Sequence, residues 1–320
     1  MISYLIKRVL IMVPVLVGLS AIIFTLVNLA PGDPYASMLD PLTPVEDREN
    51  MLASIGFYDP LPVKYLKWVG RALRGDLGFS VKYSLPVSEV IGLKIGNTLL
   101  LSITSLVLSV LLAVPLGIVS ATRQYSVFDY SATVLALVGV SVPSFFFALG
   151  VVKIFAIDFK WFPISGMEYI AKGLTGFERV LDIAHHMVLP ILVLTLIATA
   201  SKMRYTRSAM LDVIGQDYIR TARAKGLSER VVIYNHALKN ALIPVITIIS
   251  GSLGGLLSGS ILIETIFSWP GMGTLVYQAI DNRDYPLIMG GTLLLAICVL
   301  MANMIADILY ALVDPRIRFD

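Results

Sequence analysis

The stretch DYIRTARAKGLSERVVIYNHALKNALIP, residues 217–244, decides the fold, because it is a basic, helix-forming segment between two apolar ones. Asp217 is expected to cap a short helix, and Gly226 is expected to end that helix in a left-handed turn. Ser228 can cap a second helix, and Lys239 lies near the expected end of it, where its charge suits the helix dipole. The sequence therefore predicts a helix, a glycine break and a second helix, where a membrane-embedded protein meets a soluble partner.

The composition is that of a polytopic membrane protein. Of the 320 residues, 57% are apolar and only 15% are charged, and the mean hydropathy is +0.81. The apolar residues come in long runs and are too many for one soluble core. We therefore expect an all-α integral membrane protein with a single transmembrane domain over residues 1–320. Because most basic residues flank apolar runs, the net charge of +3 is expected to orient the chain in lipid, and no nucleic-acid partner is expected.

Six runs are long enough to cross about 30 Å of hydrocarbon. They cover residues 9–30, 97–121, 131–156, 187–200, 241–263 and 287–313. The fourth run is short of apolar residues, so its helix must continue through Tyr205, with Lys202 and Arg204 reaching the membrane interface.

Basic residues close to the span ends predict the orientation of the chain. They precede the first span at Lys7 and Arg8, fill residues 207–240 and follow the sixth span. Both termini and the segment 207–240 are therefore expected on the cytoplasmic side of the cell (inner or plasma) membrane. Residues 31–96 then form an external helical insertion, which is basic but too long for its charge to decide topology.

The external insertion is expected to contain two helices. A capping box with Thr43 and a proline at the next position starts the first helix. The second is expected to run from Pro62 to Gly75, with Val63, Leu66, Val69 and Leu73 on one apolar face. This helix either lies on the membrane or packs on a neighbour, so a lid on the chain's own spans and a docking surface both remain open.

Several kinds of catalytic and metal chemistry have no basis in the sequence. No glycine-rich loop ending in Gly-Lys-Ser or Gly-Lys-Thr occurs, so we expect no ATP site and no enzyme activity in this chain. The one cysteine, Cys298, lies in an apolar run, which argues against disulfides and thiolate metal sites. His185 and His186 are sequence neighbours that point differently on a helix. We therefore expect no catalytic residue, no cofactor and no metal site.

Two functions of other classes stay open. A proton-coupled secondary carrier needs titratable groups in its spans, and the candidates Lys153, Asp158, Glu264 and Asp307 lie near predicted span ends. A purely structural subunit is the other alternative. The small-residue run at 251–260 is interpreted as close helix packing.

The central segment resembles the cytoplasmic EAA loop of ABC-importer permeases, in the form found in the oligopeptide and dipeptide permeases. Arg220, Thr221 and Ala222 stand at the E-A-A positions, and Gly226 stands at the glycine position. Arginine and threonine replace the usual glutamate and alanine, which is typical of the peptide-permease branch. Further segments that resemble this branch are LAPGDP (29–34), GDLGFS (75–80), WFPISG (161–166), ETIFSWPGMG (264–273), NRDYP (282–286) and DILYALVDPRIRF (307–319).

The resemblance implies a type I ABC importer permease fold with six transmembrane helices and a cytoplasmic coupling helix. It assigns the ATPase-coupling loop to Tyr218, Ile219, Arg220, Thr221, Ala222, Arg223, Ala224, Lys225, Gly226 and Leu227. Of these, Tyr218, Ile219, Ala222 and Leu227 are expected to bury apolar surface in a groove of the ATPase. Arg220, Arg223 and Lys225 are expected to pair with acceptors of that partner.

The resemblance also implies the function and the partners. The chain would be half of the translocation pathway for di- or oligopeptides, and relatives that carry oligosaccharides or nickel leave those substrates as alternatives. A second homologous permease chain, two cytoplasmic ATPase subunits that bind ATP and Mg²⁺, and an external solute-binding protein are the implied partners. Residues 31–96 and the turn 269–273 are candidate contacts for the binding protein.

Overall fold

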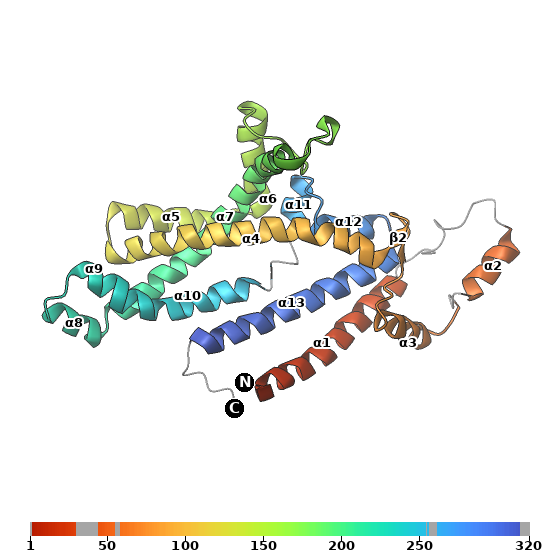
Figure 1. Cartoon of the computed structure of the whole chain (residues 1–320), viewed down its shortest axis with the longest axis horizontal. Helices are drawn as coiled ribbons and strands as arrows, with labels where there is room; N and C mark the ends of the chain where they lie inside the picture. The colour runs from red at the N-terminus through yellow and green to blue at the C-terminus, as the bar shows by residue number, and fades with distance from the viewer. Residues whose placement is uncertain (1, 30–43, 55–57, 254, 256–260, 314–320) are drawn as a thin grey trace.

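A computed structural model describes residues 2–29, 44–54, 58–253, 255 and 261–313. This part of the chain is helical apart from loops and one short hairpin, and its long helices form an elongated bundle (Figure 1). Five helices are long and apolar enough to cross a membrane, and a bent pair of helices makes a sixth candidate. The expected all-α membrane protein with six spans is thereby confirmed.

The helices are α1 (Ile2–Leu29), α2 (Val45–Ser54), α3 (Leu61–Ala72), α4 (Val87–Thr122), α5 (Val127–Ser141), α6 (Ser144–Val151), α7 (Gly176–Ile214), α8 (Asp217–Ala224), α9 (Glu229–Val231), α10 (Leu238–Leu253), α11 (Ile261–Ile266), α12 (Met272–Asp281) and α13 (Tyr285–Val313). Two π-helical turns, η1 (Val152–Asp158) and η3 (Val232–Ala237), and one 3-10 turn, η2 (Ile170–Lys172), connect them. The hairpin pairs β1 (Phe79–Ser80) antiparallel with β2 (Leu85–Pro86). Figure 1 shows α8 and α9 at one end of the bundle and the hairpin at the other, and these are called the α8 end and the hairpin end.

The centre of the bundle is the contact between α4 and α7. A Cβ atom added to Gly117 would lie 2.6 Å from Thr206 Cβ and 2.9 Å from the Met203 carbonyl oxygen. Glycine at this position therefore lets the two long helices approach closely, as small residues do in membrane proteins. Ala136 of α5 and Ala200 of α7 extend the same packing to a third helix.

The third span is not one continuous helix across residues 131–156. Its two halves, α5 and the helix formed by α6 and η1, meet at an angle of 105°. Pro143 begins the second half, and Val142 before it is extended with φ −76° and ψ 127°. Proline disfavours the helical conformation of the residue before it, which explains the break. In Figure 1, α5 follows α4 while α6 projects away from the long helices.

The fourth and fifth spans are more continuous than the apolar runs indicated. Helix α7 has 39 residues, which confirms that the fourth span continues through Tyr205. Lys202 is only 6% exposed, so the expectation that it reaches the membrane interface is wrong. Helix α9, η3 and α10 follow one another without a break, so the predicted helix end near Lys239 is also wrong. Residues 254 and 256–260 of the small-residue run lie outside the described residues.

The two helices predicted in the external insertion are present as α2 and α3. Thr43, which was expected to start the first helix, lies outside the described residues. Of the predicted apolar face of the second helix, Val69 packs on the chain's own spans, whereas Val63, Leu66 and Leu73 are exposed. The face that packs is therefore rotated away from these three side chains, and their contact with the membrane stays a prediction.

Helix α3 packs on the chain's own spans through aromatic side chains. Trp68 is buried, and its ring centre and that of Tyr65 lie 6.2 and 5.4 Å from the ring of Phe24 on α1. The Tyr65 hydroxyl also lies 2.9 Å from the Ser20 hydroxyl, and Met289 of α13 completes the cluster. Aromatic residues bury large areas and determine which face of the helix is covered.

Candidate functional site

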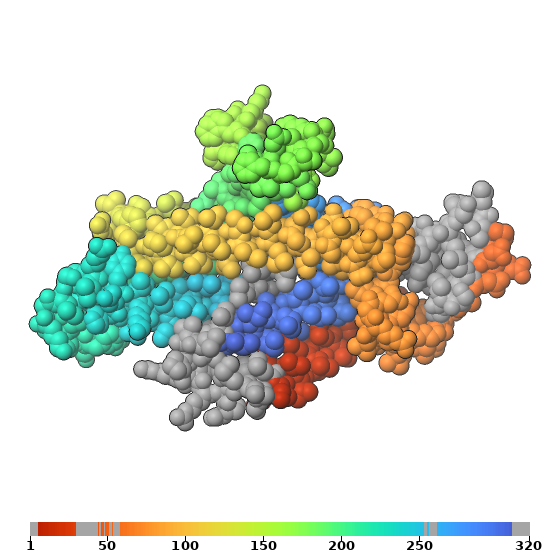
Figure 2. Space-filling view, in the orientation of Figure 1, coloured from red at the N-terminus to blue at the C-terminus, as the bar shows by residue number. Residues whose placement is uncertain are grey.

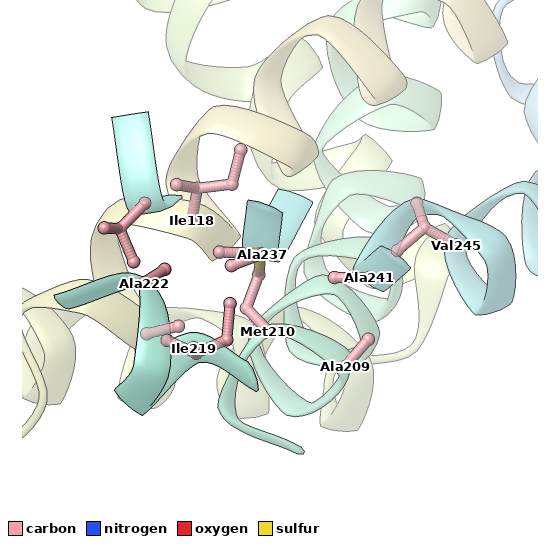
Figure 3. Packing of buried hydrophobic residues seen from close by; sticks show 10 residues of the cluster. Ile118, Ala209, Met210, Ile219, Ala222, Ala237, Ala241 and Val245 are labelled. Atoms are coloured by element: carbon pink, nitrogen blue, oxygen red, sulfur yellow. The ribbon is translucent and has the colours of Figure 1, made fainter. Parts of the chain in front are cut away.

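The candidate site is the loop around α8, which packs on the ends of the long helices. Ile219 is fully buried and Ala222 is almost so, although both belong to a short polar helix. They point toward Ile118 of α4 and Met210 of α7 (Figure 3). We call the whole cluster the α8 seat; its residues are Ile118, Ala121, Ala209, Met210, Ile219, Ala222, Val232, Ala237, Ala241 and Val245.

The helix break at Gly226 forms as the sequence predicted. Gly226 has φ +77°, and its N–H donates to the Arg223 carbonyl at 2.9 Å. A Cβ atom at Gly226 would meet nothing within 4 Å, so the site needs glycine for its backbone conformation and not for space. Helix α9 then starts after Ser228, which takes the N-cap position without a side-chain hydrogen bond. At the start of α8 the N-cap is Gln216, so the prediction that Asp217 caps this helix is wrong by one residue.

An ion pair closes the loop across the glycine break. Arg223 donates from Nη2 and Nε to the Glu229 carboxylate at 2.6 and 3.1 Å. Such bidentate geometry fixes orientation as well as distance. The Glu229 carboxylate raises the pKa of Arg223 above its usual value. Arg223 is thus paired within the chain, and its pairing with an acceptor of the ATPase stays a prediction.

The other polar residues of α8 are less constrained. Arg220 and Asp217 are both exposed, and Arg220 Nη1 lies 3.6 Å from Asp217 Oδ1. Thr221 donates its hydroxyl hydrogen to the Asp217 carbonyl at 3.0 Å, and Asn240 of α10 donates to the Tyr218 hydroxyl at 3.0 Å.

The loop has two distinct faces. Because Ile219 and Ala222 are buried by the chain's own helices, the expectation that they enter a partner's groove is wrong. Their spacing places them on one side of α8, and that side is occupied. Tyr218 and Leu227 are 44% and 41% exposed and lie on the free face. The other exposed residues between 218 and 227 are Arg220, Thr221, Arg223, Ala224, Lys225 and Gly226. Figure 2 shows α8 and α9 at the surface of one end of the molecule.

Glu264, a candidate for proton coupling, is a structural carboxylate. It is buried, and it accepts hydrogen bonds from the Thr98 hydroxyl at 2.8 Å and from the Thr274 N–H at 3.0 Å. Thr274 lies in the first turn of α12, where backbone N–H groups have no partner within the helix, and the Glu264 carboxylate accepts this hydrogen bond instead. A Cβ atom on Gly271 would lie 2.6 Å from Glu264 Oε1, and one on Gly273 would lie 2.8 Å from Oε2. The segment ETIFSWPGMG therefore folds as a cap around its own glutamate.

The turn 269–273 is buried together with this carboxylate. Trp269 is fully buried, and its indole N–H donates to the Asn97 carbonyl at 3.0 Å. Asn97 in turn donates to the Pro270 carbonyl at 2.9 Å. The expectation that this turn contacts a binding protein is therefore wrong for this conformation, because α4 covers it.

Other titratable candidates also have partners within the chain. Arg8 Nη2 lies 2.5 Å from Asp307 Oδ2 and joins α1 to α13, and Lys153 lies 2.8 Å from Asp158. His185 Nε2 lies 3.0 Å from the Trp161 carbonyl oxygen. Within the described ranges, no group of three or more His, Cys, Asp or Glu side chains could hold a metal ion.

Asp284 joins two sequence segments at the hairpin end. It is fully buried, and it accepts hydrogen bonds from the Ser80 hydroxyl at 2.5 Å, the Lys82 N–H at 3.1 Å and the Leu287 N–H at 3.2 Å. Ser80 belongs to GDLGFS and Asp284 to NRDYP. The two segments therefore hold the hairpin on the start of α13.

Sequence comparison agrees with this arrangement over the whole chain. A family model described as binding-protein-dependent transport system inner membrane component matches residues 113–319, and a model of the N-terminal part of such components matches residues 1–85. The oligopeptide transport system permease protein AppB of Bacillus subtilis is 43% identical over 320 residues, which is 100% of both chains. The dipeptide transport system permease proteins DppB of Escherichia coli K12 and Alkalihalophilus pseudofirmus are 37% and 38% identical, with 99% and 100% of each chain covered. These matches confirm the resemblance that the sequence segments indicated.

Proposed function

Because this chain belongs to the family of binding-protein-dependent transport system inner membrane components, we propose that it is the permease subunit of an ATP-driven importer of peptides. Members of this family are membrane components, so the chain is a multi-pass permease of the inner membrane and not the catalytic subunit of its system. Relatives named as oligopeptide and dipeptide permeases, 43% and 37% identical over essentially the whole chain, favour di- and oligopeptides over oligosaccharides or nickel.

The importer needs partners for the steps that this chain does not perform. A second homologous permease completes the pathway, two cytoplasmic ATPase subunits bind ATP and Mg²⁺, and an external solute-binding protein delivers the peptide. Residues 207–240 and both termini then lie in the cytoplasm, and residues 31–96 lie outside. The basic residues in and around α8 support this orientation.

The observation that carries the proposal is the two-faced α8. Its inner face is seated on α4, α7 and α10, whereas Tyr218, Arg220 and Leu227 are exposed on the other face. A helix held in this way cannot move without moving the ends of three spans. Closure of the ATPases against the free face would therefore become a rigid-body rocking of the spans, which opens the pathway to one side and then the other.

The test is peptide uptake by the complete importer in proteoliposomes, with ATP inside and the binding protein outside. We expect Tyr218→Ala and Leu227→Ala to release the ATPase and abolish uptake while the permease stays folded, because both side chains are exposed. Tyr277→Ala is the matched control, since Tyr277 is a similarly exposed tyrosine on α12 near the hairpin end. If both α8 variants still bind the ATPase subunits and still take up peptide, the exposed face of α8 is not the contact with the ATPase.

The same vesicles test the substrate and the energy source. Uptake of labelled peptide should need ATP and should be competed by unlabelled peptide, and not by oligosaccharide or Ni²⁺. Uptake that persists without ATP and stops when the proton gradient is dissipated would identify a secondary carrier instead.

A further inference from the structure

A buried carboxylate, Asp129, joins three parts of the chain at the α8 end. Asp129 lies in the first turn of α5 and is 3% exposed. Arg207 of α7 donates to its two oxygens from Nε at 2.7 Å and from Nη2 at 2.9 Å. The Ser120 hydroxyl of α4 donates to Oδ1, and the Tyr125 N–H donates to Oδ2 at 3.1 Å. The carboxylate thus binds α4, the α4–α5 turn and α7 at once.

This network is interleaved with the α8 seat. Ser120 lies between Ile118 and Ala121 on α4, and Arg207 lies two residues before Ala209 on α7. Three seat residues, Ile118, Ala121 and Ala209, lie within two residues of Ser120 or Arg207 in the sequence, so the same helical turns hold both α8 and Asp129. Figure 1 shows the start of α5 at the same end of the bundle as α8.

Helix α5 has no share in the α8 seat. Among the side chains that the structure describes, none from α5 belongs to that cluster or packs against it. The packing of α5 on its neighbours uses small apolar side chains such as Ala132 and Ala136, and such contacts are not directional. A bidentate arginine–carboxylate pair fixes both distance and angle. Asp129 is therefore the directional link between α5 and the helices that carry α8.

The backbone next to Asp129 is held in an unusual conformation. Tyr125 has φ +61°, a region that residues other than glycine seldom adopt, and its N–H is the group that Asp129 binds. Ser126 caps α5 by accepting from the Asp129 N–H at 3.2 Å. The turn is thus built around the carboxylate.

We propose that Asp129 is a positioning residue of the transport cycle, which with Arg207 makes α5 and the bent α6 follow the displacement of α8. The inference rests on the proposed function, because it concerns how movement from the ATPase reaches the third span. Without the pair, the ATPase still moves α8, α4 and α7, but α5 lags behind them. The expected defect is uncoupling, in which ATP is hydrolysed and less peptide is moved.

The experiment measures uptake and ATP hydrolysis on the same vesicles of the complete importer. Asp129→Asn keeps the size of the side chain and removes its charge. We expect the peptide moved per ATP to fall while ATPase binding and hydrolysis are retained. Glu168→Gln is the matched control, because Glu168 also forms a bidentate pair, with Arg179, but lies outside the α8 seat. An unchanged ratio in Asp129→Asn overturns the inference.

A second measurement separates coupling from simple loss of structure. Spin labels at Asp217→Cys on α8, which lies outside the coupling loop, and at Leu135→Cys on α5 report the distance between the two helices, with Cys298 replaced by serine so that only these two positions are labelled. We expect ATP to leave this distance unchanged with Asp129 present and to change it in Asp129→Asn. If ATP leaves the distance unchanged in the Asp129→Asn variant as well, the inference is overturned. If Asp129→Asn does not assemble, Arg207→Lys, which keeps the charge and loses the bidentate geometry, is tested by the same two criteria.

Failure of this inference differs from failure of the proposed function. An unsubstituted importer without ATP-driven peptide uptake refutes the proposed function. Normal uptake in the unsubstituted importer together with normal coupling in Asp129→Asn refutes only the role of the carboxylate.

Discussion

Replacement of Gly226 tests whether the break between α8 and α9 depends on backbone conformation alone. Gly226 has φ +77°, and no atom lies within 4 Å of the position where its Cβ would be. Gly226→Ala therefore creates no clash, and its cost is the left-handed conformation itself, about 1–2 kcal/mol. Gly226→Val should cost more, because a β-branched side chain is more restricted, and Gly226→Asn should cost less.

The chain offers a matched control at the other end of α8. Gly215 has φ −75°, and a Cβ there would lie 3.7 Å from its nearest neighbour, the Leu211 carbonyl oxygen. Gly215→Ala is free of strain and should be neutral or stabilise by about 0.4–1 kcal/mol through the unfolded chain. The two substitutions are chemically identical, so any difference between them reports the backbone.

A strain of 1–2 kcal/mol is expected to increase the fraction of molecules in which α8 has left the α8 seat by about 5- to 30-fold. Hydrogen exchange of the α8 amides in the purified permease measures this opening directly. We expect faster exchange in the order Gly226→Asn, Gly226→Ala, Gly226→Val, with uptake falling in the same order. Equal exchange in Gly226→Ala and Gly215→Ala would show that the reasoning is wrong.

Three further changes test other parts of the structure. Gly271→Ala places a Cβ 2.5 Å from the Thr98 hydroxyl, so thermal unfolding in detergent should show a loss of about 1–3 kcal/mol; an unchanged midpoint would contradict this packing. Glu264→Gln should keep ATP-driven uptake, because the carboxylate serves as a cap, and abolished uptake in a fully assembled importer would favour proton coupling instead. The Arg179 side chain holds the pKa of Glu168 below its usual value, so the stability from this pair is present above about pH 4.3 and is lost as the pH falls through the lower, folded-state value. Glu168→Gln should remove that acid dependence of the unfolding midpoint, and an identical pH profile would exclude the pair as its cause.

Features encoded by neighbouring residues were predictable from the sequence. The break at Gly226 needs only a glycine between two helix-forming segments, and it forms as expected. The spans follow from the lengths of the apolar runs, since a lipid-exposed helix satisfies all its backbone groups internally. The bend of the third span also had a local signal, Pro143, but hydropathy alone does not distinguish a straight span from a broken one.

Features that depend on which surfaces meet were not predictable. Ile219 and Leu227 are both apolar, yet the first is covered by α4 and α7 and the second is free. On α3, Leu66 is exposed whereas Trp68 is buried, because α1 and α13 cover only one side of the helix. Lys202 is buried although its sequence position indicated the interface.

The polar links across the bundle are the clearest case. Asp129 and Arg207 are 78 residues apart, and Ser80 and Asp284 are 204 residues apart. No pattern in the neighbouring sequence indicates that these four residues form long-range pairs. A charged or hydroxyl side chain in such a position is typical of a loop or of a helix cap. The two pairs were therefore missed.

The sequence by itself determined the membrane class, the number of spans, the helix–glycine–helix loop and the family. Each of these is set by composition, by the length of an apolar run or by residues that adjoin in the chain. The tertiary structure alone decided which face of α8 is free, where the third span bends out of the bundle and how Asp129 joins α5 to α7. These depend on long-range packing, because burial and charge pairing arise only when helices that are distant in sequence come within contact distance.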